Sequence, residues 1–219
     1  MTIERAITNY EHRLRETMLW MEEDYLGREA TAGYSGNAAH EVVVREVGQH
    51  VVSYYFRRPK SLIFAQWFHF TAFTVSTTGD GPDMIIRGGP ADPRAKLRWL
   101  AESDLAGYLT GKVCAGEAWS WDSDVALAEI KSELTELRDS AADVRIEVEK
   151  WETLIEAWED ASPDCEGEMY IMADEAGLDC TDFHHFGRTV SYDLMRVQVA
   201  ARCLLRALLP SWKTEPVGE

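Results

Sequence analysis

The chain has 219 residues, of which 46% are hydrophobic and 11% are aromatic, so it can bury a substantial core and wholesale disorder is excluded. Its formal net charge is −16 at pH 7, and all of the excess lies between Asp122 and Asp182, where 20 Asp or Glu accompany only 4 Lys or Arg. Such a concentration of charge creates a directional field that repels nucleic acid and attracts basic surfaces. We therefore expect no direct contact with nucleic acid.

The sequence contains no run of about 18 apolar residues, and its first residues lack the apolar segment of a secretory signal. We therefore expect no contact with a membrane. The four cysteines, Cys114, Cys165, Cys180 and Cys203, form no closely spaced pairs, which is typical of reduced thiols in a cytoplasmic protein. The pattern predicts a cytoplasmic location and no metal ion or other cofactor.

The first half of the chain changes from helix to strand. Apolar residues at steps of three and four predict a helix over 3–26, and a Gly- and Asn-containing segment predicts a loop over 31–39. Runs of β-branched and aromatic residues, separated by turn residues, then predict five strands over 40–47, 50–57, 61–70, 71–77 and 84–87. Short consecutive strands with tight turns favour an antiparallel meander.

The second half is predominantly helical. After a loop over 90–93 we expect a helix over 95–108, whereas the segment 114–121 is ambiguous. Unbroken steps of four and three between Ile130 and Trp158 predict one continuous helix over 123–161, roughly 55 Å long at 1.5 Å per residue. The pattern then indicates a short helix or strand over 168–176, a loop over 180–187 and a final amphipathic helix over 189–209.

These elements predict the α+β class: an antiparallel meander of about five strands packed with the N- and C-terminal helices, plus one long acidic helix with a heptad pattern. The long helix begins the second half, so we expect two regions, residues 1–112 and 113–219. We expect both regions to fold together as one domain.

When the acidic segment is written as heptads, its basic and its acidic residues fall at different positions around the helix. The basic residues Lys131, Arg138 and Arg145 flank the apolar seam, and carboxylates point outward. We identify the outward carboxylates as a candidate partner-binding surface: Glu136, Asp139, Asp143, Glu149 and Glu156. Spaced carboxylates can imitate the phosphate track of duplex DNA. The alternatives are a solvated helix face, a homodimer through the seam, and a seam that packs on this chain's own helices.

No GxSxG, P-loop, GxGxxG or HExxH motif is present, which favours a non-enzymatic protein. An alternative ligand site lies in the meander, where His69 shares a strand face with Trp67 and where Asp80 and Asp83 follow in a glycine-rich turn. These three polar side chains form a candidate site for a small molecule or nucleotide. The His184–His185 pair has no second ligand pair at conventional spacing, so we do not interpret it as a metal site.

The stretch 40–87 resembles a group of uncharacterised proteins encoded by tailed bacteriophages and prophages. The resemblance rests on a segment that opens with His40 and β-branched residues, an Arg-Pro turn at 58–59, the aromatic strand 64–70, the strand 73–79 and a Gly-Asp turn. Gly81 and Pro82 directly after Asp80 depart from the pattern of that group. The resemblance implies an origin in phage genomes and an accessory, non-virion role.

Together these observations lead us to expect a phage-encoded, non-enzymatic accessory protein that binds a basic host or defence protein through its acidic helix. An inhibitor of a host defence or nucleic-acid-handling protein fits this expectation, and such a protein acts in the cytoplasm of the host cell. The alternatives are a small-molecule or nucleotide-binding domain centred on the meander, and a structural homo-oligomer formed through the heptad seam.

Overall fold

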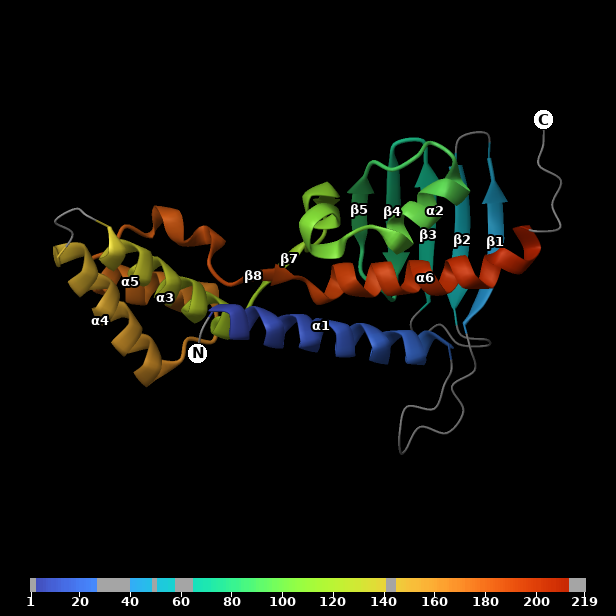
Figure 1. Ribbon diagram of the computed structural model, residues 1–219. Coiled ribbons are helices and arrows are strands. Elements are labelled where there is room, and N and C mark those ends of the chain that lie inside the picture. Colours follow the sequence, from blue (N-terminus) through green and yellow to red (C-terminus); the bar gives the residue numbers. More distant parts are fainter. Residues whose placement is uncertain (1–2, 27–39, 49–50, 58–64, 141–144, 213–219) are drawn as a thin grey trace. The chain divides into compact units, whose positions relative to one another are not determined.

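The computed structural model describes residues 3–26, 40–48, 51–57, 65–140 and 145–212 (Figure 1). The chain divides into two compact units. The helical unit comprises residues 1–14 and 119–189, and the sheet unit comprises residues 15–118 and 190–219. The C-terminal helix therefore belongs to the sheet unit. The loop expected over 31–39 lies outside the described residues.

The sheet unit is built on a six-stranded antiparallel sheet in which each strand pairs with the next along the chain. The order is β1 (Glu41–Val47), β2 (Val51–Arg57), β3 (Gln66–Thr71), β4 (Thr74–Gly79), β5 (Met84–Arg87) and β6 (Val113–Ala115). The predicted meander and the α+β class are confirmed. The sixth strand comes from the segment that the sequence left ambiguous.

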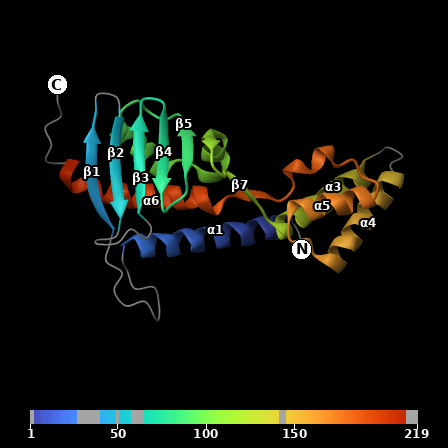
Figure 2. The same ribbon diagram turned by 180° about the vertical axis from the view of Figure 1, so that it is seen from behind.

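Helices cover one face of this sheet, as Figures 1 and 2 show from opposite sides. They are α2 (Pro93–Glu102) and α6 (Tyr192–Trp212), with the short helical turns Leu105–Leu109 and Thr110–Lys112 after α2. Alternate strand residues point toward them because side chains in a strand alternate between faces. The fully buried residues on this face include Phe68, Phe70, Val75 and Ile86.

The helix α1 (Ile3–Leu26) has the bounds that the sequence predicts. Its residues from Arg15 onward belong to the sheet unit, where Met21 and Tyr25 are buried. The Tyr25 ring stacks on Phe56 of β2 at a centroid distance of 5.6 Å, and Glu22 forms an ion pair with Arg206 of α6. These contacts fasten the second half of α1 to the sheet and to the C-terminal helix.

The helical unit contains α3 (Ser123–Asp139), α4 (Arg145–Ala161), α5 (Glu166–Glu175) and the 3₁₀ turn Cys180–His185. The short strands β7 (Trp119–Trp121) and β8 (Arg188–Val190) pair at its base. Its core is formed by one cluster of buried side chains from the helices, the 3₁₀ turn and the segments that flank this turn: Ala126, Ile130, Leu154, Trp158, Met169, Ala173, Leu178, Phe183 and Phe186.

The prediction of one continuous helix over 123–161 is wrong. α3 ends at Asp139, and Ser140 is extended with φ −69° and ψ 143°. Lys131 on α3 is 2.6 Å from Glu159 on α4, whereas 28 residues of a single helix would separate them by roughly 42 Å. α3 and α4 therefore form an antiparallel pair, called the acidic hairpin below.

The two halves of the heptad seam pack against each other and against α5. Ile130 and Trp158 are buried in the core cluster, and Leu134 is buried beside them. Leu154, which is not one of the apolar residues of the heptad seam, is also fully buried. This arrangement favours the alternative in which the seam packs within the chain. The seam residues Ala141 and Val144 lie outside the described residues.

Candidate functional site

The acidic hairpin carries far more carboxylates than its own cations can pair. α3 and α4 hold eleven Asp or Glu and four Lys or Arg. Lys131 pairs with Glu159, Arg138 with Glu152, and Arg145 with Glu149 at 3.1 Å. The hydrogen bond from Lys131 lowers the pKa of Glu159. Three of the four cations are thus engaged within the hairpin, so the remaining carboxylates give its surface a strong negative charge.

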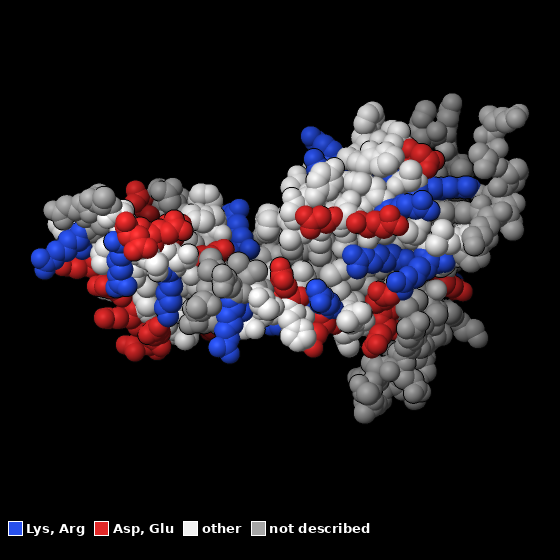
Figure 3. All heavy atoms as spheres, in the orientation of Figure 1, with Lys and Arg blue, Asp and Glu red and all other residues white. Residues whose placement is uncertain are grey.

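Four of the five predicted partner-binding carboxylates are exposed on this surface, and Asp143 lies outside the described residues. Glu136 and Asp139 are three residues apart on α3, and Glu149 and Glu156 are seven residues apart on α4, so each pair shares a helix face. Glu149 is the partner of Arg145. Figure 3 shows carboxylates gathered over the helical unit, with a few basic side chains between them. The predicted stripe is therefore split between two helices.

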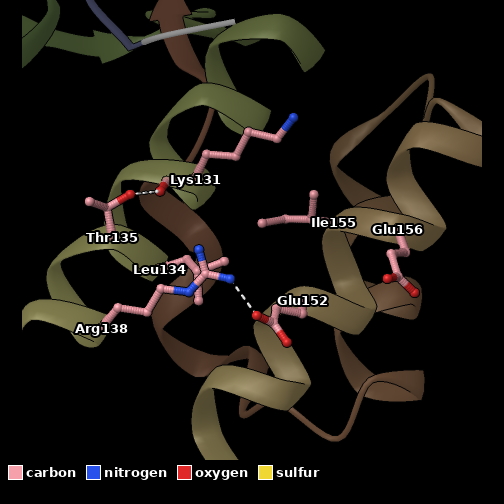
Figure 4. Close-up of a pocket in the computed structure, with 7 residues that line it drawn as sticks. All are labelled: Lys131, Leu134, Thr135, Arg138, Glu152, Ile155 and Glu156. Carbon is pink, nitrogen blue, oxygen red and sulfur yellow. Dashed lines mark hydrogen bonds and ion pairs between the residues drawn. The ribbon is translucent and has the colours of Figure 1, made fainter.

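A groove of about 580 Å³ lies between the two helices of the hairpin (Figure 4). Arg138 reaches from α3 toward Glu152 on α4, and Leu134 and Ile155 line the groove near this ion pair. Lys131, Thr135 and Glu156 complete the lining. Two cations and two carboxylates line the groove, so its charges are balanced. The excess negative charge lies on the outer surfaces of the hairpin.

The structure separates two of the three alternative ligand residues, His69 and Asp80, whereas Asp83 lies in the same turn as Asp80, between β4 and β5. The Nδ1 atom of His69 is 2.8 Å from the hydroxyl of Ser53 on β2. The backbone N–H of Asp80 donates to the carbonyl of Ala65 at 2.8 Å, beyond the opposite end of β3. Ala65, the hydrogen-bond partner of Asp80, precedes His69 by four residues along the strand, which is a distance of roughly 13 Å.

One of the three nevertheless lines a hollow in the sheet unit. This hollow, called the sheet pocket below, has a volume of about 360 Å³ and is lined by Tyr55, Ala65, Trp67, Gly79 and Asp80. It lies on the face away from α2 and α6, because Trp67 alternates along β3 with the buried Phe68 and Phe70 of the helix-covered face. Ala65 precedes Trp67 by two residues and Tyr55 is directly opposite it on β2, so both share its face. Sequence reasoning identified Asp80 and the shared face of Trp67 and His69 but missed Tyr55 and Ala65. The signal for Tyr55 is its cross-strand pairing with Trp67.

Among the described residues, no group of three or more His, Cys, Asp or Glu side chains is arranged to hold a metal ion. The rings of His184 and His185 are exposed and nearly perpendicular, with their centroids 5.8 Å apart. No helix in the described part of the chain is sufficiently long and apolar to cross a membrane.

The chain matches no protein-family model, no curated protein and no solved structure. The chemistry and the geometry of its own residues are therefore the basis for assigning a function.

Proposed function

We propose that the protein is a non-enzymatic binding protein whose acidic hairpin contacts a basic protein partner. The observation that carries this proposal is the excess of exposed carboxylates that remains after the hairpin's ion pairs are formed. Concentrated charge of one sign steers an oppositely charged partner and raises its association rate. It also opposes the approach of nucleic acid, whose phosphates carry the same charge.

The size of the hairpin favours a partner that itself handles nucleic acid. Each helix has 17 residues and is roughly 25 Å long. Duplex DNA of that length carries about 15 phosphate charges, whereas the two helices together carry a net charge of −7. The hairpin is therefore a partial imitation of a phosphate track. The resemblance of residues 40–87 to phage-encoded accessory proteins supports a host or defence protein as the target.

The proposal is tested by removing charge while keeping side-chain size. In the hairpin variant, the five candidate carboxylates are replaced by their amides: Glu136→Gln, Asp139→Asn, Asp143→Asn, Glu149→Gln and Glu156→Gln. In a matched control variant, five exposed carboxylates outside the hairpin are replaced in the same way: Glu11, Glu23, Asp83, Glu102 and Glu117. Both variants lose the same formal charge, so only its position differs.

Partners captured from bacterial host lysate by the wild-type protein are identified, and their affinities for all three proteins are measured at two salt concentrations. We expect the hairpin variant to bind at least tenfold more weakly and the control variant to bind within about threefold of the wild type. We also expect affinity to fall as salt rises. Equal binding by wild type and hairpin variant would overturn the proposal, as would equal weakening in both variants.

The burial of Ile130, Leu134 and Trp158 within the helical unit favours this binding role over a homo-oligomer formed through the seam. A seam that is already covered offers little apolar area to a second copy. Light scattering at high protein concentration distinguishes the two, because the seam oligomer requires a mass at least twice that of the chain.

A further inference from the structure

The groove between α3 and α4 is lined by one carboxylate that no ion pair neutralises. Lys131 and Arg138 line it from α3, and Glu152 and Glu156 line it from α4. Arg138 pairs with Glu152, whereas Lys131 pairs with Glu159, which does not line the groove. Within the described part of the chain Glu156 forms no ion pair. The ion pairs therefore leave the negative charge of Glu156 available to a ligand.

The polar groups of the two walls differ in the same way. On α3 both cations are engaged, and the hydroxyl of Thr135 donates to the carbonyl of Lys131 at 2.8 Å. On α4, Nη2 of Arg138 bonds to Oε1 of Glu152, and an ionised carboxylate has about four acceptor positions. Glu152 and Glu156 are four residues apart on one helix face, where Cβ atoms are about 5–6 Å apart. The α4 wall thus presents two neighbouring acceptors to a donor.

The surface between the walls is apolar. Leu134 is buried and Ile155 is half-buried, and both line the groove near the Arg138 side chain (Figure 4). This combination suits a side chain that has an apolar stem and a cationic end, because such a side chain covers apolar surface while its charge stays at the edge. Arginine fits best, since its planar guanidinium has five N–H donors and can bond to two carboxylates at once.

We propose that the groove receives an arginine side chain of the basic partner, whose guanidinium bonds to Glu152 and Glu156 and displaces Arg138. This inference rests on the proposed role of the acidic hairpin and identifies the residue type that the hairpin recognises. The side chains of Arg138 and Glu152 are 53% and 42% exposed, and exposed ion pairs contribute little to stability, so the pair is readily exchanged. In the free protein Arg138 therefore occupies the position that the partner's arginine takes in the complex.

Two peptides of equal charge are the probes: a heptalysine peptide with blocked ends, and the same peptide with arginine at its central position. The general attraction of the acidic hairpin acts equally on both, so the ratio of their affinities isolates the arginine. Fluorescence anisotropy of labelled peptides with the full chain at low salt measures this ratio. We expect the arginine peptide to bind about fivefold more tightly, because only guanidinium forms the forked contact.

A matched pair of carboxylate variants locates the contact. Glu156→Gln should reduce the preference for the arginine peptide to less than about twofold, because the groove then has no unneutralised charge. Glu136→Gln removes an exposed carboxylate of α3 that does not line the groove. It should weaken both peptides alike and leave the preference unchanged. Circular dichroism of each variant verifies that the helices are intact.

A matched pair of arginine variants tests the displacement. Arg138→Gln and Arg145→Gln each remove one cation from the acidic hairpin, so both increase its general attraction for either peptide. Only Arg138→Gln also frees Glu152, since Arg145 pairs with Glu149 and does not line the groove. We expect Arg138→Gln to raise the affinity for the arginine peptide at least about twofold more than Arg145→Gln does.

Equal affinity of the wild type for the two peptides would overturn this proposal, as would a preference that persists in Glu156→Gln. It also fails if the arginine peptide does not bind, or if Arg138→Gln raises its affinity no more than Arg145→Gln does. If the peptides bind equally and the hairpin variant binds both more weakly, the groove proposal fails while the proposed role of the acidic hairpin stands. If the hairpin variant binds both as tightly as the wild type, the two proposals fail together.

Discussion

Arg138, one residue before the end of α3, forms an ion pair with Glu152 on α4, fourteen positions further along the chain. A continuous helix would separate these residues by roughly 21 Å, because each residue advances the helix by 1.5 Å. The two side chains meet only when the chain reverses direction between α3 and α4. This single pair therefore distinguishes a hairpin from a rod.

A double-mutant cycle of Arg138→Gln and Glu152→Gln measures the coupling free energy between these two side chains in solution. We expect a coupling free energy of about 0.2–1 kcal/mol at low salt, typical of exposed ion pairs, and a decrease as salt rises. Arg145 and Glu149 form an intrahelical pair that exists in either arrangement, so their cycle is the control. Zero coupling between positions 138 and 152, with coupling retained between 145 and 149, would falsify the hairpin.

The core of the helical unit predicts a second effect. Leu154 is fully buried among the hairpin and α5 although it lies outside the heptad positions. We expect Leu154→Ala to lower the free energy of unfolding by about 2–5 kcal/mol, because it removes buried methyl groups and leaves a cavity. Ile146, also on α4, is 73% exposed, and Ile146→Ala should change stability by less than about 0.5 kcal/mol. Urea denaturation measures both, and similar values for the two variants would contradict this packing.

The sequence predicts the strands well and the helix break poorly, for a physical reason. Runs such as Val42–Val44 and Trp67–Phe70 have high β propensity and clear turn residues around them. The segment 140–144 contains no Pro or Gly, and its residues keep the heptad spacing, so no local feature marks the reversal. The reversal is evident only from tertiary contacts such as Lys131 with Glu159. Both helices contribute seam residues to one core, Ile130 from α3 and Trp158 from α4, although the fully buried Leu154 is not a seam residue.

The sheet pocket was predictable only in part. Strand alternation correctly places Trp67 and His69 on one face, as their parallel rings show. Tyr55 lines the pocket because the register between β2 and β3 places it opposite Trp67. Asp80 lines it because its backbone N–H donates a hydrogen bond to the carbonyl of Ala65. The register between strands joined by loops depends on tertiary structure. The sequence alone therefore could not show that Asp80 and His69 lie at different levels of the sheet.

Gly79 offers a test of the backbone beside the sheet pocket. Gly79→Ala should destabilise the sheet unit by about 1–3 kcal/mol, because the residue has φ +129° and the new Cβ would approach the Ala65 carbonyl. At Gly111 a Cβ would have nothing within 4 Å and the φ is not left-handed, so Gly111→Ala should be neutral or slightly stabilising. Thermal denaturation compares them. A Gly79→Ala variant as stable as Gly111→Ala would show that this backbone conformation is not required.

Lys96 predicts a dependence of stability on pH. Its side chain is fully buried in α2, and its Nζ donates to the carbonyls of Ala72 and Gly88 at 3.1 and 2.6 Å. Burial lowers the pKa of Lys96 below its usual value near 10.4. Between the lowered pKa and about 10.4 the unfolded chain binds more protons than the folded chain, so the contribution of Lys96 to stability increases as pH rises.

Comparison with Lys96→Met isolates this contribution. We expect the difference in unfolding free energy, wild type minus variant, to increase between pH 8 and 10.5 by at most about 1.4 kcal/mol per pH unit. Other titrating groups, including Tyr54, whose pKa burial raises, are common to both proteins and cancel in the difference. A difference that stays flat or decreases over this range would contradict a lowered pKa for Lys96.

The cysteines differ in burial, and this difference predicts their reactivity. Cys203 is buried in α6, and desolvation raises its pKa to about 12, whereas Cys114 and Cys165 are exposed. Because the thiolate is the reactive form, iodoacetamide at pH 8 should alkylate Cys114 and Cys165 on the order of 100-fold faster than Cys203. Burial, followed by Asp174 and Asp179, raises the pKa of the half-buried Cys180, so its rate should be intermediate. Peptide mapping by mass spectrometry follows each site.

Denaturation provides the control, because all four thiols should react at similar rates in urea once burial is lost. The same pKa shift also affects stability. Above about 8.5 the unfolded chain releases the Cys203 proton while the folded chain retains it up to about 12, so the stability that Cys203 contributes declines as pH rises through this window. Cys203→Ala should lack this decline. Rapid alkylation of Cys203 in the native protein would show instead that α6 leaves the sheet easily.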